Sequence, residues 1–264
     1  MAGFFTDGAA YERMMGRWSR AAGDIFLGWL ALPPGLDWLD VGCGTGAFSE
    51  LVLERCQPHT LKAIDPSEDQ IAYARTTPAA AHVKFQVGEA ESLPFADAEF
   101  DIATMALVIT FIADPAKALA ELRRVVKPGG TIATFVWDFL NGGSPQQPLR
   151  EAVESLGVAV PPTAGHANST PQRLEEIFRA ASLEAVATRS IEIEVSYPDF
   201  ETYWTSQTAL ANTVVQHLRA MTEADVARVK AWLRAHLPTD PAGRIVYKAR
   251  ASAARARVPA ATAA

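Results

Sequence analysis

Glycines gather in one short stretch, Leu39–Gly46, which contains Gly42, Gly44 and Gly46. With Ala47 the stretch satisfies the pattern G-x-G-x-x-G/A, in which a tight turn lets a ligand approach the backbone closely. An apolar run precedes it and a helical pattern follows it, which is the setting in which such a loop holds part of a nucleotide-like ligand. The pattern alone is weak evidence, because a plain turn between a strand and a helix also favours glycine.

Two aspartates help to distinguish the possible ligands. Asp40 stands two residues before Gly42 at the end of an expected strand, where a carboxylate would repel a pyrophosphate. S-adenosylmethionine carries an ammonium and a sulfonium instead, so Asp40 favours the methyl donor unless it only caps the glycine turn. Asp65 ends the next expected strand, where it can accept hydrogen bonds from the ribose of any adenosine ligand. Its alternative role is the N-cap of the helix that Pro66 opens.

Strand and helix patterns alternate from residue 36 to residue 137, which is typical of a parallel sheet with helices on both faces. Asp114 and Pro115 are a cap and a first helical residue, and a Lys-Pro-Gly-Gly run at 127–130 ends that helix. The expected strands are 36–41, 61–65, 83–87, 100–108 and 131–137, and the expected helices are 45–56, 66–75 and 115–127.

Beyond residue 140 the pattern is less regular. The helical stretch 200–236 lies between two further expected strands, 184–195 and 244–252, and is predicted to be an insertion packed over the sheet edge. Two shorter helices are expected near 149–156 and at 171–182. We predict one domain, divided into a helical cap (1–30), a cofactor-binding core (31–140), a loop and helix (141–182), the final strands with a helical lid (183–252) and a tail (253–264).

Four motifs follow one another in order: Leu39–Gly46, Asp65, Gly88–Phe95 with Phe100-Asp101, and Leu122–Gly130. Together they resemble the class I S-adenosylmethionine-dependent methyltransferases, and within them the type 11 group that includes the ubiquinone/menaquinone C-methyltransferases. The resemblance covers residues 36–137. It implies an α/β fold, a Rossmann-like three-layer sandwich whose seven-stranded, mostly parallel sheet has an antiparallel last strand, with a helical lid. It also implies S-adenosylmethionine as the cofactor.

The resemblance assigns contacts to that cofactor. Relatives read the adenine amino group with an acid after the third strand, where this chain has Glu89, and Ala106 offers only its backbone at the end of the fourth strand. Relatives also close a stretch like Tyr11–Ser19 over the cofactor, where Arg17 would pair with the methionine carboxylate and Tyr11 or Trp18 would cover the sulfonium. An ordinary amphipathic helix is the alternative. The expected cofactor-binding residues are Tyr11, Arg17, Asp40, Gly42, Cys43, Gly44, Thr45, Gly46, Asp65, Pro66, Glu89, Ala90, Met105 and Ala106.

No catalytic residue stands out. Asp138 ends the fifth expected strand near the expected ligand mouth, which makes it a weak candidate for a base or an acceptor-orienting group, with a loop cap as the alternative. The aromatic stretch Tyr197–Trp204 is either a roof over the acceptor or simply core. The five histidines form no metal-binding pattern, so no metal is expected.

Composition narrows the class of protein further. A net charge of −6 without a basic block argues against a nucleic-acid partner, and no apolar run is long enough for a membrane span. Two cysteines, Cys43 and Cys56, fit a reducing cytoplasm. We therefore expect a cytoplasmic monomer or homodimer that transfers a methyl group from S-adenosylmethionine to a small-molecule acceptor. An NAD-dependent oxidoreductase and a non-catalytic protein that binds an adenosyl ligand are the alternatives.

Overall fold

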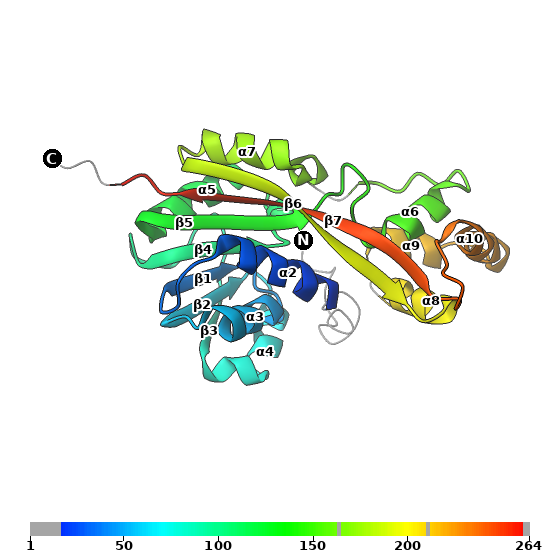
Figure 1. Ribbon diagram of the computed structural model, residues 1–264, viewed down its shortest axis with the longest axis horizontal. Helices are drawn as coiled ribbons and strands as arrows, with labels where there is room; N and C mark the ends of the chain where they lie inside the picture. The colour runs from blue at the N-terminus through cyan, green and yellow to red at the C-terminus, as the bar shows by residue number, and fades with distance from the viewer. Residues whose placement is uncertain (1–16, 163–164, 210–211, 261–264) are drawn as a thin grey trace.

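A seven-stranded sheet in the order β3-β2-β1-β4-β5-β7-β6 forms the centre of the protein (Figure 1). The computed structural model describes residues 17–162, 165–209 and 212–260. Strand β7 pairs antiparallel with both of its neighbours, and the other pairs are parallel, as expected. The strands are β1 (Asp37–Val41), β2 (Thr60–Asp65), β3 (Val83–Val87), β4 (Phe100–Ala106), β5 (Val126–Trp137), β6 (Glu184–Tyr197) and β7 (Ile245–Arg257).

Helices cover both faces of this sheet. Helices α5 and α7 pack on one face of the sheet and α2, α3 and α4 pack on the other. Each face has its own apolar core, one built around Phe26 and Phe135 and the other around Leu122 and Phe178. The helices are α2 (Arg17–Leu30), α3 (Ala47–Cys56), α4 (Glu68–Ala74), α5 (Pro115–Val125), α6 (Gln147–Glu154), α7 (Pro171–Ala180), α8 (Phe200–Thr208), α9 (Thr213–Arg219) and α10 (Glu223–His236), with short 3₁₀ turns η2 (Pro78–Ala81), η3 (Ile109–Phe111) and η4 (His166–Ser169).

Several strand boundaries differ from the expected ones. Strand β4 stops at Ala106 because Leu107 has a φ of 64°, which a strand does not allow. Strand β5 begins at Val126, which pairs with Phe100 across an irregular register, so the Pro-Gly-Gly run lies inside the strand. Strand β7 continues to Arg257 because β5 pairs with it as far as Thr131. The predicted tail from residue 253 is therefore partly strand.

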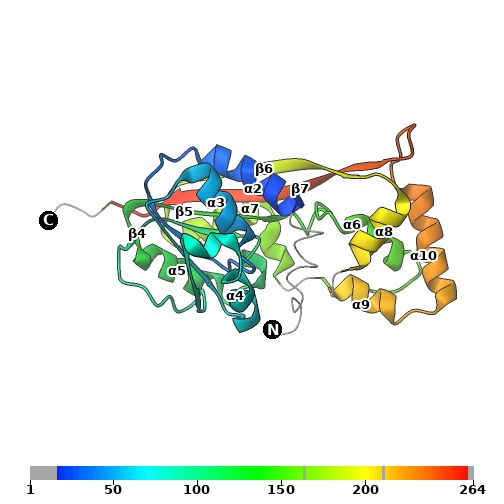
Figure 2. The ribbon, with the colours of Figure 1, turned by 90° about the horizontal axis from the view of Figure 1, so that it is seen from below.

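The helices between β6 and β7 do not lie over the sheet edge, which corrects the prediction. Strand β5 ends opposite Ala251, but the β6–β7 pair continues to Tyr197 opposite Ile245, beyond the reach of β5. Helices α8, α9 and α10 pack against α6 and the far ends of β6 and β7, and form a separate helical lobe (Figure 2). Alternate residues of β6, from Ile191 to Tyr197, are buried, so this extension is amphipathic and needs an apolar cover.

Among the residues that the structure describes, no helix combines the length and the apolar composition that crossing a lipid bilayer requires.

Candidate functional site

The glycine loop joins the carboxyl end of β1 to α3. The backbone N–H groups of Gly42 and Cys43 both donate to the carbonyl of Ile64, at 2.8 and 2.9 Å, which fastens the loop to β2. The N–H of Gly46 donates to the carbonyl of Cys43 at 2.9 Å and closes the turn. Gly46, with a φ of 90°, is the residue that precedes α3. Backbone hydrogen bonds therefore fix both ends of the loop.

The three glycines of the loop have positive φ values but different surroundings. A Cβ atom on Gly42 would come within 2.4 Å of Val108, and one on Gly46 within 2.8 Å of Phe85, so these two glycines allow close internal packing. A Cβ atom on Gly44 would meet no atom within 4 Å. Gly44 is thus the glycine that faces open space, as a backbone approached by a ligand must.

Asp65 lies beside this open space. Its Oδ2 accepts a hydrogen bond from the Gly44 N–H at 2.9 Å, and its Oδ1 accepts one from the Ser67 N–H at 2.9 Å. Burial raises the pKa of Asp65, and the two backbone hydrogen bonds oppose that rise. The N-cap of α4 is Ser67 rather than Asp65, since the Ser67 hydroxyl accepts from the Gln70 N–H. Each carboxylate oxygen of Asp65 retains a lone pair for a ligand donor.

Asp40 is fully buried at the end of β1. Its Oδ2 accepts a hydrogen bond from the Ser49 hydroxyl of α3 at 2.6 Å, and its Oδ1 has no partner among the described residues. Burial raises the pKa of Asp40 to about 7, against the opposing effect of the Ser49 hydrogen bond. The sequence did not single out Ser49, although its place on the helix after the glycine loop is the signal that could have found it. The unpaired Oδ1 leaves an acceptor for a cation or a donor beneath the loop.

The remaining predicted contacts surround the same strand ends. Glu89 is exposed after β3, and Ala106 is half-buried at the end of β4. Met105 is fully buried, and its carbonyl already accepts a hydrogen bond from the Thr134 hydroxyl at 2.7 Å. Cys43 and Thr45 are buried in the glycine loop, and Pro66 is exposed before α4.

The amino-terminal contacts do not all reach this place. Tyr11 lies outside the described residues. The Arg17 guanidinium donates to the Ser196 carbonyl at 2.7 Å and lies 4.9 Å from the centre of the Tyr197 ring, at the end of β6. Trp18 is 2% exposed and packs edge-on against Tyr197, so its ring belongs to the core. Both described residues have the contacts of an ordinary amphipathic helix.

Asp138 has the contacts of a loop cap. It is 2% exposed, and its Oδ2 accepts a hydrogen bond from Arg250 Nε at 3.0 Å. The side-chain amide of Asn141 donates to both of its oxygens, at 3.0 and 3.2 Å, and the Asn141 N–H donates to Oδ1. A carboxylate that accepts this many hydrogen bonds from fixed groups is poorly suited to remove a proton from a substrate. The aromatic stretch after β6 is likewise core, since Tyr197 and Tyr203 are buried.

Two kinds of similarity to known proteins agree with this geometry. The family model described as "Methyltransferase domain" matches residues 39–134, from the glycine loop to β5. The structure of the YcgJ protein from Bacillus subtilis superimposes with a TM-score of 0.59 at 18% identity, covering 90% of this chain and 98% of that one. At that identity the likeness concerns the fold alone.

Curated relatives match over the same region. A malonyl-[acyl-carrier protein] O-methyltransferase of Serratia marcescens is 37% identical over 145 residues, which cover 53% of this chain and 54% of the relative. The ubiquinone/menaquinone biosynthesis C-methyltransferase UbiE of Roseobacter denitrificans is 32% identical over 148 residues, covering 54% of this chain and 58% of the relative. The chain thus spans little more than half the length of these relatives.

The matched region contains the glycine loop, Asp40, Asp65 and the ends of the first four strands of the chain. Residues 39–134 therefore match a methyltransferase domain, in agreement with the resemblance of this region to the class I S-adenosylmethionine-dependent methyltransferases of the type 11 group.

Proposed function

We propose that the chain binds S-adenosylmethionine at the glycine loop and transfers its methyl group to a small-molecule acceptor. The observation that carries this proposal is the open space in front of Gly44, with the Asp65 carboxylate beside it. A ligand there meets backbone on one side and two acceptor oxygens on the other. This combination suits a nucleoside whose ribose hydroxyls donate to Asp65.

The other predicted residues fit the rest of the cofactor. Glu89 and Ala90 follow β3, next to β2, and would contact the adenine, and Met105 and Ala106 would contact the cofactor from β4. The unpaired oxygen of Asp40 would favour the ammonium of the methionine part, directly or through a water molecule. Arg17 and Tyr11 remain proposed contacts of a closed amino-terminal segment. When bound, the cofactor supplies a methyl group on a positively charged sulfur, ready for attack by the acceptor.

Positioning is the main task that remains for the protein. Asp138, the candidate base at these strand ends, is occupied by Arg250 and Asn141. Alignment of the acceptor with the methyl group and exclusion of water then supply most of the catalysis. We propose that the acceptor lies between the carboxyl ends of β4 and β5 and the helical lobe, because ligands of α/β sheets bind at these ends.

We further propose that the protein acts on a small molecule in the cytoplasm, as a monomer or a homodimer. The net charge of −6 supports an acceptor other than nucleic acid. Curated relatives are named for oxygen and carbon acceptors, so both are candidate reaction types here. The two cysteines are free thiols, which fits a reducing compartment.

Calorimetry with three ligands tests the proposal against its alternatives. We expect S-adenosylmethionine and S-adenosylhomocysteine to bind with micromolar affinity and NAD to show no heat of binding. Binding of NAD alone would support the oxidoreductase. Transfer of a labelled methyl group from S-adenosylmethionine to a small molecule of a metabolite extract then separates an enzyme from a protein that only binds the cofactor.

A further inference from the structure

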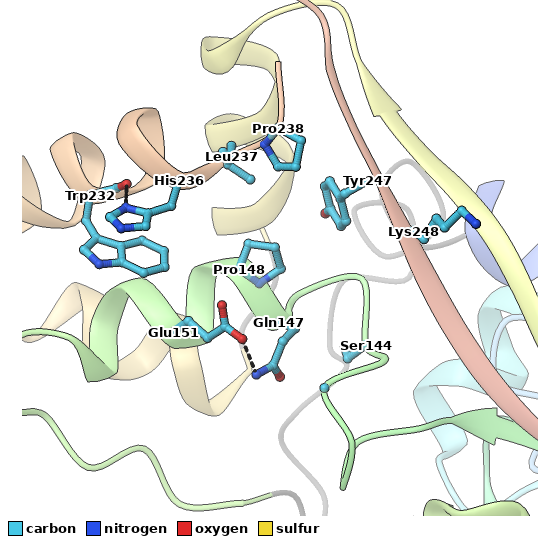
Figure 3. Close-up of a pocket in the computed structure, with 11 residues that line it drawn as sticks. Ser144, Gln147, Pro148, Glu151, Trp232, His236, Leu237, Pro238, Tyr247 and Lys248 are labelled. Atoms are coloured by element: carbon cyan, nitrogen blue, oxygen red, sulfur yellow. Dashed lines mark hydrogen bonds between the residues drawn. The ribbon is translucent and has the colours of Figure 1, made fainter. Parts of the chain in front are cut away.

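A pocket lies in the helical lobe, away from the glycine loop. It has a volume of about 250 Å³ and lies between α6, the carboxyl end of α10 and β7 (Figure 3). Its lining residues come from the loop after β5 and from these three elements, and none comes from β1 to β4. The volume suits a small ligand, and the lining residues include charged and aromatic side chains whose arrangement indicates what that ligand is.

The charge on the wall of this pocket is negative. The Glu151 carboxylate of α6 faces it, and among the described residues only its Oε1 accepts a hydrogen bond, from Gln147 Nε2 at 3.0 Å. Lys248 also lines the pocket, but its side chain points away from it (Figure 3) and pairs with Glu192. The second oxygen of Glu151 is therefore available to a cation that enters.

The carboxyl end of α10 adds acceptors to the same pocket. In a continuing helix the N–H of residue 238 would donate to the carbonyl of Arg234, but Pro238 has no N–H. The carboxyl end of α10, whose His236 lines the pocket, therefore keeps the partial negative charge of a helix terminus. Nδ1 of His236 lies 2.8 Å from the carbonyl of Trp232, which can only accept, so Nδ1 carries the proton. In the neutral imidazole the other nitrogen, Nε2, is then an acceptor as well.

Aromatic rings complete the wall. The Trp232 and His236 rings are stacked with their centres 4.0 Å apart and their planes within 11°, and the Tyr247 ring lies across the pocket from them (Figure 3). The faces of such rings attract cations, and a carboxylate beside them strengthens that preference.

An anion fits this place poorly, although α6 begins here. Among the first N–H groups of α6, that of Gln147 already donates to the Ser144 carbonyl at 3.0 Å. Pro148 has no N–H to offer, and the Arg150 N–H donates to the Gln146 carbonyl at 3.2 Å. The start of this helix therefore lacks the set of free donors that anion sites at helix N-termini use.

We propose that this pocket binds a small primary ammonium group, free or as part of a larger amine. The ammonium donates its hydrogen bonds to Glu151 and to the acceptors at the end of α10, and its charge lies against the Trp232 and Tyr247 rings. This binding is independent of the glycine loop and does not rest on the proposed methyl transfer.

Nuclear magnetic resonance of the indole N–H signals tests the proposal with n-propylammonium as the probe. The Trp232 signal is identified by its loss in Trp232→Phe. We expect n-propylammonium at millimolar concentration to move this signal to saturation, and n-propanol and propionate, which have the same size, to leave it in place. A saturating shift with propanol or propionate, or none with the ammonium, overturns the proposal.

Two glutamate variants then locate the charge that is responsible. Glu151→Gln is expected to weaken n-propylammonium binding by about tenfold or more, which corresponds to about 1.4 kcal/mol. Glu154→Gln is the matched control, because Glu154 lies on the same helix, pairs with Arg150 and does not line the pocket. The other tryptophan signals show that each variant is folded. Equal affinity in wild type and Glu151→Gln contradicts the proposal.

Discussion

Aspartates stand at the carboxyl ends of both β1 and β2, on one side of the sheet centre, and directly after β5, on the other. Asp65 and Asp40 keep acceptor capacity, since Asp65 accepts one hydrogen bond at each oxygen and Asp40 accepts one in all. Asp138 accepts hydrogen bonds from Arg250 and Asn141 at both of its oxygens. A position at the end of a parallel strand is thus not sufficient for a ligand contact, because the neighbouring donors decide what a carboxylate can still bind.

Gly44→Ala is the substitution on the β1–β2 side from which we expect the largest loss of ligand affinity. The added methyl group enters the space in front of the loop, so affinity for S-adenosylhomocysteine should fall by about 100-fold or more, about 2.7 kcal/mol. Isothermal titration calorimetry measures this loss. Gly129→Ala is the matched control, because Gly129 also has a positive φ and open space at its Cβ but lies at the opposite end of the sheet.

Both glycine variants are expected to lose about 1–2 kcal/mol of unfolding free energy through the strained backbone. An equal loss of ligand affinity in the two would show that the effect of Gly44 is strain and not occlusion.

Asp40→Asn should raise the unfolding free energy, whereas most substitutions at buried sites lower it. The pKa of Asp40 is raised to about 7, and the pKa of an unfolded aspartate is about 3.9. Between these values the unfolded chain has lost the proton that the folded protein keeps, so the unfolding free energy falls as the pH rises from about 4 to about 7. Asn removes this loss while still accepting from the Ser49 hydroxyl.

Ligand-free Asp40→Asn should therefore be about as stable as wild type near pH 4, and more stable by about 2–4 kcal/mol near pH 8. Urea unfolding at the two pH values measures the difference. Parallel pH profiles for the two proteins would mean that Asp40 is ionised in the folded state or that its pKa is ordinary.

Asp138→Ala tests whether the aspartate after β5 stabilises the fold rather than binding a ligand. It removes the acceptor of Arg250 and Asn141, and we expect the unfolding free energy to fall by about 2–3 kcal/mol, the range for buried hydrogen bonds to a charged group. Affinity for S-adenosylhomocysteine should stay within a factor of about two. A stable variant that binds the cofactor but has lost methyl transfer would restore Asp138 as a catalytic candidate.

Asp65→Ala should show the opposite pattern to Asp138→Ala. We expect S-adenosylmethionine affinity to fall by about 1.5–3 kcal/mol, because the ribose loses its charged acceptor. A 2′-deoxyribose analogue should lose less, since it has one hydroxyl fewer, and the part of the loss common to both ligands reports the Gly44 N–H that Asp65 also holds. Titrations of both ligands that show identical losses would exclude a contact between Asp65 and the 2′-hydroxyl.

The core of the fold was largely predictable. Strand β3 has the predicted bounds, and the strands and helices from β1 to α5 all occur near their expected positions, because their apolar runs end at glycine, proline and capping residues. Asp114 caps α5 and Pro115 is its first residue, as predicted. The roles of Asp40 and Asp65 as carboxylates beside the glycine loop also follow from local sequence, and the family match covers the same region.

The lobe was less predictable, because its position depends on strand pairing. The alternation of residues 184–195 predicts a strand, but only the register with β7 shows that it continues past β5 and carries α8 to α10 with it. The sequence left two roles open for Arg17 and Trp18, a cover over the cofactor or an ordinary amphipathic helix, and only the structure shows Arg17 against Tyr197 and Trp18 in the core. The amphipathic pattern of α2 predicts which face of the helix is buried, but not which surface that face packs against.

The sequence by itself determined the class of fold, the glycine loop and the acids beside it, since these depend on residues close together in the chain. Only the tertiary structure decided which glycine faces open space, because Val108 and Phe85, far from the loop in sequence, fill the space at the other two. It likewise decided that Asp138 is a cap, because its partner Arg250 lies on β7, 112 residues away. The free acceptors of a side chain depend on the donors that folding brings to it, and these come from distant parts of the chain.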